Sequence, residues 1–62
     1  MNDAQIIQSA YADALRRVFK VLVDALASAA GDATAAAQAA NEFKTGVALV
    51  RKARDEALQL VQ

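Results

Sequence analysis

One short stretch constrains the fold more than any other feature: AAGDAT, at residues 29–34, is the only strong break in a chain that contains no proline. Alanine is the most common residue on both sides of it, so helix propensity is high throughout. Gly31 suits the left-handed position after a helix, and Asp32 suits the N-cap of the next one. Asn2, with Gln5 three residues later, is typical of a capping box. We therefore predict helices at about residues 3–30 and 33–61.

A tight link between two long helices favours an antiparallel hairpin, so the predicted fold is all-α, with residues 1–62 forming a single domain. Each helix would be about 42 Å long at the usual rise of 1.5 Å per residue. The alternative is one continuous helical rod that runs through Gly31, because glycine inside a helix costs only about 1 kcal/mol relative to alanine.

Apolar residues recur at helical spacing in both predicted helices, which indicates a seam where the helices meet. Leu26 extends this stripe toward the end of the first helix, and charged residues occupy the opposite side of that helix. The predicted intrachain seam consists of Ile7, Tyr11, Leu15, Val18, Leu22, Phe43, Val47, Val50 and Leu58.

Each helix also carries apolar residues beside the seam, more than one helix–helix contact can bury. Gly46 lies seven residues from both Ala39 and Ala53, in a strip of small residues where another helix can come close. Arg54 is expected to cover apolar surface with its stem while its guanidinium reaches water or a carboxylate of another chain. The predicted oligomer interface consists of Phe19, Val21, Val23, Gly46, Leu49, Ala53, Arg54 and Leu60.

The length of the chain also favours association. A domain of 62 residues is marginally stable by itself, and small domains usually depend on a disulfide, a metal or a partner chain. The chain has no cysteine and no histidine, which excludes a disulfide and argues strongly against a zinc or transition-metal site. Association with further copies of the same chain is the remaining means of stabilisation, so we predict a homo-oligomer.

Catalysis is not expected. Ser9, Ser28, Thr34 and Thr45 have no histidine that could act as their general base. Asp55 and Glu56 point about 100° apart on a helix, and we expect them to pair with Arg51 and Lys52, four residues earlier. AAGDAT has one glycine and lacks the lysine of a phosphate-binding loop. We therefore predict no enzyme activity, no cofactor and no small-molecule substrate.

Charge and hydropathy bear on the partners. The net charge is zero, and acidic residues interleave with the basic ones that could contact a phosphate backbone, so nucleic acid is not expected as a partner. The longest uncharged run, residues 33–41, is far shorter than the roughly 20 residues of a membrane span. The first residues have no pattern of a secretory signal peptide. These observations leave open a cytoplasmic location and export by a route that needs no such signal.

Residues 45–62, TGVALVRKARDEALQLVQ, carry a resemblance to a family of short motility proteins. In that family glycine or serine is followed by aliphatic residues, two basic residues, a small residue and aspartate. Arg54 stands where the family has a large aliphatic residue. The resemblance implies helices similar to the terminal coiled-coil helices of flagellar axial proteins, and the hairpin shape is similar to that of needle or rod subunits of secretion systems. The matching positions are Gly46, Val47, Leu49, Val50, Arg51, Lys52, Ala53 and Asp55.

The sequence thus leads to two hypotheses about function. The first is a structural, self-assembling subunit of a filament, a rod or another homo-oligomer that acts through helix–helix contacts. The alternative is a closed dimeric four-helix bundle that acts as an adaptor, or as an RNA-binding regulator similar in architecture to the small Rop-like proteins. The candidate RNA contacts in that case would be Arg16, Arg17, Lys20, Lys44, Arg51 and Lys52.

Overall fold

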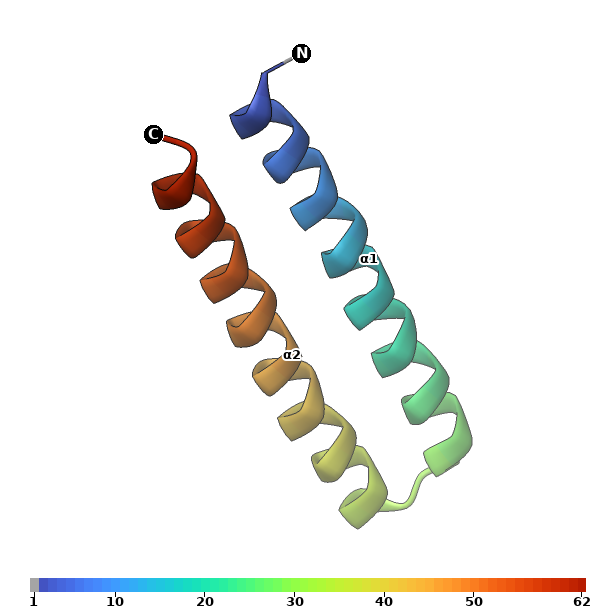
Figure 1. The fold of residues 1–62 in the computed structure, drawn as a ribbon. Coiled ribbons are helices and arrows are strands. Elements are labelled where there is room, and N and C mark those ends of the chain that lie inside the picture. The colour runs from blue at the N-terminus through green and yellow to red at the C-terminus, as the bar shows by residue number, and fades with distance from the viewer. Residues whose placement is uncertain (1) are drawn as a thin grey trace.

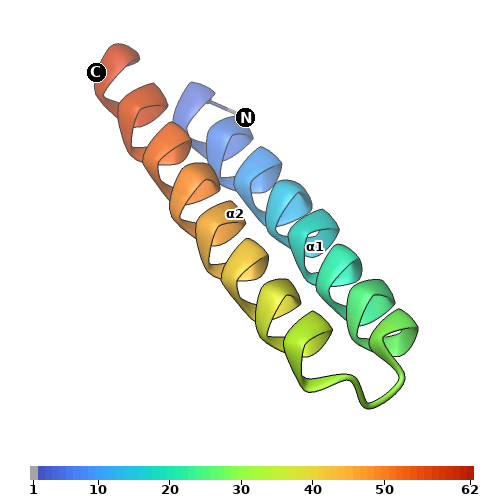
Figure 2. The ribbon, with the colours of Figure 1, turned by 90° about the horizontal axis from the view of Figure 1, so that it is seen from below.

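The computed structural model describes residues 2–62 and consists of two antiparallel helices, α1 (Asp3–Ala29) and α2 (Ala33–Leu60). The helices lie side by side along their whole length, and the two ends of the chain lie at the same end of the molecule (Figure 1). The view from below shows the same arrangement (Figure 2). The predicted hairpin is confirmed, and the alternative of a continuous rod is wrong.

Both helices begin at the predicted caps. The Asn2 side chain accepts a hydrogen bond from the Gln5 amide at 2.8 Å, and the Gln5 side chain accepts one from the Asn2 amide at 3.0 Å. The Asp32 carboxylate accepts hydrogen bonds from the amides of Thr34 and Ala35 at 2.9 and 3.2 Å. These bonds satisfy amides that have no partner within their own helix, and each such cap contributes about 1 kcal/mol.

The turn differs from the prediction by one residue. The first left-handed residue is Ala30, with φ 48° and ψ 42°, so α1 ends at Ala29. Gly31 follows with φ 88°, and the Asp32 amide donates a hydrogen bond to the Ala29 carbonyl at 2.8 Å. Two successive residues with positive φ reverse the chain within three residues. The second helix likewise ends one residue earlier than predicted, at Leu60.

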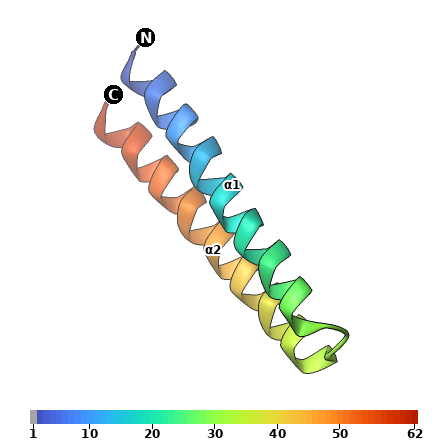
Figure 3. The same cartoon turned by 90° about the vertical axis from the view of Figure 1, so that its right-hand side faces the viewer.

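The hairpin is a plate one helix thick, and its Cα atoms extend over 46 × 17 × 6 Å. A view rotated by 90° shows the two helices as a single layer (Figure 3). Only Ala39, at 5% exposure, is buried among the described residues. The fold therefore has a seam between two helices and no enclosed core.

The structure places all nine predicted seam residues in partly buried positions between the helices. Leu26, expected to extend the seam, is 45% exposed, and the small residues Ala25 and Ala29 take its place. The physical reason is the helical period. Leu22 already lies about 40° past Val18, so a second step of four places Leu26 about 80° past Val18 and out of the seam, whereas Ala25, seven residues after Val18, returns to within about 20° of it.

Candidate self-association surfaces

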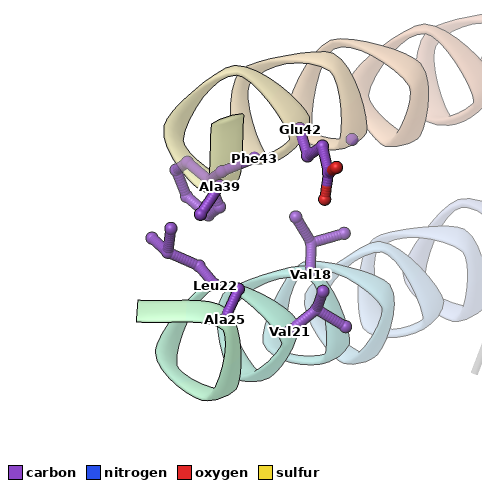
Figure 4. Close-up of a pocket in the computed structure, with 8 residues that line it drawn as sticks. Val18, Val21, Leu22, Ala25, Ala39, Glu42 and Phe43 are labelled. Atoms are coloured by element: carbon purple, nitrogen blue, oxygen red, sulfur yellow. The ribbon is translucent and has the colours of Figure 1, made fainter. Parts of the chain in front are cut away.

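One broad side of the plate carries a groove between the helices, which we call the groove face. In the half of the hairpin nearer the turn lies an open hollow of about 170 Å³ between Val21 of α1 and Gly46 of α2. Figure 4 shows this hollow, with the Glu42 side chain reaching from α2 toward Val18 of α1. Alanines continue the groove toward both ends of the hairpin. They are Ala10, Ala14, Ala53 and Ala57 near the termini, and Ala25, Ala29, Ala35 and Ala39 near the turn.

Gly46 lies in the contact between α1 and α2, although the sequence places it on a surface for another chain. A methyl group added at this position would lie 3.1 Å from Cγ1 of Val18, which is tighter than ordinary van der Waals contact. The absence of a side chain therefore lets the α1 side chain of Val18 lie directly against the α2 backbone. Together with the burial of Ala39, this contact explains how small residues bring the two helices together.

The opposite broad side, which we call the Phe19 face, is dominated by larger side chains. Phe19 is 57% exposed and lies beside Leu15 and Phe43, with Ala12 and Arg16 at the edge of the same shallow depression. Val23 and Leu26 extend the apolar surface of α1 toward the turn. The depression has a volume of about 500 Å³, so this face is hollowed as well.

Exposed apolar residues also flank the groove face. Val21 is 59% exposed, Leu49 66% and Leu60 85%. Of the eight predicted interface residues, the structure leaves Phe19, Val21, Val23, Leu49, Ala53 and Leu60 exposed. They fall on two sides of the plate: Phe19 and Val23 on the Phe19 face, and the other four on the groove side. Each broad side of the molecule thus presents large apolar side chains to water.

Arg54, the eighth predicted interface residue, is held within the hairpin. Its side chain is 25% exposed, its guanidinium carbon lies 4.4 Å from the centre of the Tyr11 ring, and its Nε donates to Asp55 at 3.0 Å. The position of Arg54 above an aromatic face explains why a charged residue can occupy the seam. The position of Arg54 on the apolar stripe can be predicted from the sequence. Its contact with Tyr11 cannot, because that contact depends on which α1 residue lies opposite Arg54.

The remaining ion pairs lie on the outer surfaces of the helices. Arg16 pairs with Asp13 at 2.8 Å, and Lys20 with Asp24 at 3.1 Å. The predicted pair of Lys52 with Glu56 is present at 3.9 Å. The expectation that Asp55 pairs with Arg51 is wrong, because the neighbouring Arg54 binds Asp55 instead. All of these pairs are local to one helix, so they stabilise helices and leave the two broad faces free of cross-links.

Residues 2–62 contain no group of three His, Cys, Asp or Glu side chains arranged to hold a metal ion. In the same part of the chain, neither helix has both the length and the apolar character needed to cross a membrane. What the two broad faces do offer is exposed apolar side chains.

No protein-family model, no curated protein and no solved structure matches the chain. The resemblance of residues 45–62 to motility proteins therefore stays a prediction.

Proposed function

We propose that this protein is a structural subunit that assembles with copies of itself into an extended homo-oligomer, such as a filament or a rod. The observation that carries the proposal is the presence of large exposed apolar side chains on both broad faces of a plate one helix thick. Isolated exposed apolar residues are normal on monomers, but here each broad face carries several of them in addition to the partly buried residues of the seam.

Energetics also favour association. Burying one Val, Leu or Phe side chain fully stabilises by about 1.5–3 kcal/mol, and the isolated hairpin buries none of its large apolar residues completely. A chain of this size is marginally stable without further contacts. Covering Phe19, Val21 and Leu49 with another copy would supply the apolar burial that a single hairpin lacks.

The distribution over two faces favours an open assembly over a closed pair. A two-fold dimer uses the same patch on both copies, so it would cover one broad face and leave the other exposed. Covering both faces requires each copy to contact two neighbours. Such an arrangement continues along one direction unless it curves into a ring.

Static light scattering over a range of protein concentrations tests the proposal. We expect the mean mass to rise with concentration without stopping at two chains. The variant Leu49→Glu should abolish this growth and retain helical circular dichroism, because it places a charge on an apolar strip outside the seam. Thr45→Glu, one turn earlier on the outer side of α2, is the matched control and should still assemble.

A constant mass of two chains would contradict the open assembly and favour the closed four-helix bundle acting as an adaptor or RNA-binding regulator. A constant mass of one chain would contradict self-association altogether. Undiminished growth of Leu49→Glu would show that the strip around Leu49 is not an assembly surface.

A further inference from the structure

Between the two ends of the hairpin, the groove side carries two charged side chains that form no ion pair with another described residue. They are Arg17 of α1 and Glu42 of α2. Glu42 overhangs the hollow beside Gly46 (Figure 4). Arg17 lies one helical turn before Val21, which lines the same hollow, so Arg17 projects on the same side of the plate. The groove side thus has one unpaired charge of each sign, and the two charges are on different helices.

The Phe19 side has unpaired charges of one sign only. Lys44 follows Phe43 and points about 100° away from it, on the side opposite to Glu42, which precedes Phe43 and lines the groove. Arg51 lies two turns after Lys44 in the same row of α2. Neither cation forms an ion pair within the described part of the chain. Two Phe19 faces brought together would therefore oppose cations, whereas two groove faces can oppose a cation and an anion.

We infer that two copies of the chain pack groove face on groove face about a two-fold axis parallel to the helices. In this pair α1 of each copy lies over α2 of the other, and the two turns lie at the same end. The pairing rests on the proposed function and specifies one of its two contacts, and the Phe19 faces then join one pair to the next. Complementary charge across a contact favours the correct partner and register.

A two-fold axis along the helices keeps every residue at its own height, so the register inside one hairpin predicts which residues meet between copies. Inside the hairpin, Val18 lies level with Gly46, and Tyr11 lies level with Arg54. At this register, each large apolar side chain exposed on the groove side meets a small or apolar residue of the other copy. The meeting pairs are Val21 with Gly46, Leu49 with Ala14, and Ile6 with Leu60.

The charges agree with the same register. Glu42 of one copy comes opposite a charged row of α1 in the other, which consists of Arg17, Lys20 and Asp24. Because Lys20 is already paired with Asp24 at 3.1 Å, the unbalanced charge of that row is the positive charge of Arg17. At a rise of 1.5 Å per residue, Arg17 and Glu42 of the other copy are offset by about 8 Å along the axis, which two long side chains can span.

The reversed overlay, with each turn on the termini of the other copy, lacks this complementarity. Arg17 lies near the middle of the hairpin, so reversing one copy brings the two Arg17 side chains together. Like charges brought together at an interface are strongly unfavourable. The turn-on-turn orientation is therefore the favoured one.

The size of the groove face fits a second copy. The Cα atoms of a broad face extend over 46 × 17 Å, which is close to the area of about 800 Å² that each partner of a stable, specific interface buries. The occupant therefore has to cover nearly the whole length of the face. A second hairpin laid turn on turn has this length.

Charge reversal on the groove face tests the contact between copies. All variants carry Phe19→Glu, which disables the other face and should leave a mass of two chains by light scattering. At the concentration where this parent is half paired, adding Arg17→Glu or Glu42→Arg should give mainly single chains. An equimolar mixture of these two variants should regain the mass of two chains and any helical circular dichroism lost on separation, because each reversed charge then meets its opposite. Lys44→Glu, on the Phe19 side, is the matched control and should pair like the parent.

Pairing of the Arg17→Glu or Glu42→Arg variant alone, as strong as in the parent, would overturn the inference, because the two positions would then lie outside the contact. A single-chain mass for Phe19→Glu would overturn it as well, because the groove face would not bind itself. In both cases, growth of the unmodified chain with concentration leaves the proposed function in place. An unmodified chain that stays single at every concentration overturns the inference and the proposed function together.

The orientation of the two copies has a separate test. The chain has no cysteine, so Thr34→Cys in the Phe19→Glu chain attaches one nitroxide label to the exposed first turn of α2. In the turn-on-turn pair both labels lie at the same end, and pulsed dipolar spectroscopy should give a distance well below the 46 Å length of the hairpin. A distance close to that length would indicate the reversed overlay and overturn the inference.

Discussion

At the scale of single residues, Gly46 and Val18 determine how closely the two helices approach each other. Gly46→Ala adds about 1 kcal/mol of helix propensity but brings a methyl group to 3.1 Å from the Val18 side chain. We expect the strain to cancel part of this gain in the unmodified chain. In the Val18→Ala background the full gain of about 1 kcal/mol should appear. Urea unfolding followed by circular dichroism, at one protein concentration, gives the free energy of unfolding of the unmodified chain, the two single variants and the double variant. An equal gain from Gly46→Ala in both backgrounds would argue against a close contact between position 46 and Val18.

Arg54 gives a second prediction at this scale. Arg54→Gln removes the cation from the face of the Tyr11 ring and should destabilise the hairpin by about 1 kcal/mol. The matched control is Lys52→Gln, which removes an exposed pair with Glu56 and should cost less than about 0.5 kcal/mol. Thermal unfolding at a fixed concentration compares the two. A larger loss of stability in Lys52→Gln than in Arg54→Gln would mean that the contact of Arg54 with the Tyr11 ring contributes little.

At the scale of the elements, the turn holds a residue that is strained by its backbone conformation. Ala30 has φ 48°, which costs an L-residue with a side chain roughly 1–2 kcal/mol. Ala30→Gly should therefore raise the thermal midpoint, with a stabilisation of about 1 kcal/mol. The same substitution at Ala27, inside α1, should destabilise by about 1 kcal/mol because it weakens a regular helix. A loss of stability in both variants would argue against a left-handed residue at position 30.

Much of the architecture of α1 and α2 could be predicted from the sequence, because the caps depend on local chemistry. Asn2 and Asp32 bind amides within three residues of themselves, and no distant contact is needed to place them. The seam followed from helical spacing. The sites of Gly46 and Arg54 could not be predicted in the same way, because both depend on which α1 residue lies opposite. That register is set by Ala30 turning the chain one residue before the glycine.

At the scale of the whole molecule, stability and assembly should be linked. If neighbouring copies cover the apolar strips, the folded hairpin is stabilised by mass action, so its thermal midpoint should rise with protein concentration. Leu49→Glu should show a lower midpoint that no longer depends on concentration, while Thr45→Glu should retain the dependence. Circular dichroism melts over a range of chain concentrations provide the measurement. If the thermal midpoint of the unmodified chain does not change with concentration, assembly does not stabilise the fold and the prediction is wrong.

The single-layer form of the plate has a consequence for the exchange of backbone amide hydrogens with solvent. Since no second layer covers either side, amides in the isolated hairpin are protected chiefly by their own helical hydrogen bonds, and local opening exposes them directly to water. Dilute protein should therefore exchange quickly along most of both helices. At concentrations where copies assemble, the slowest amides should be those around Val21 and Gly46, which line the hollow of the groove face, so that deuterium uptake maps the faces that other copies cover.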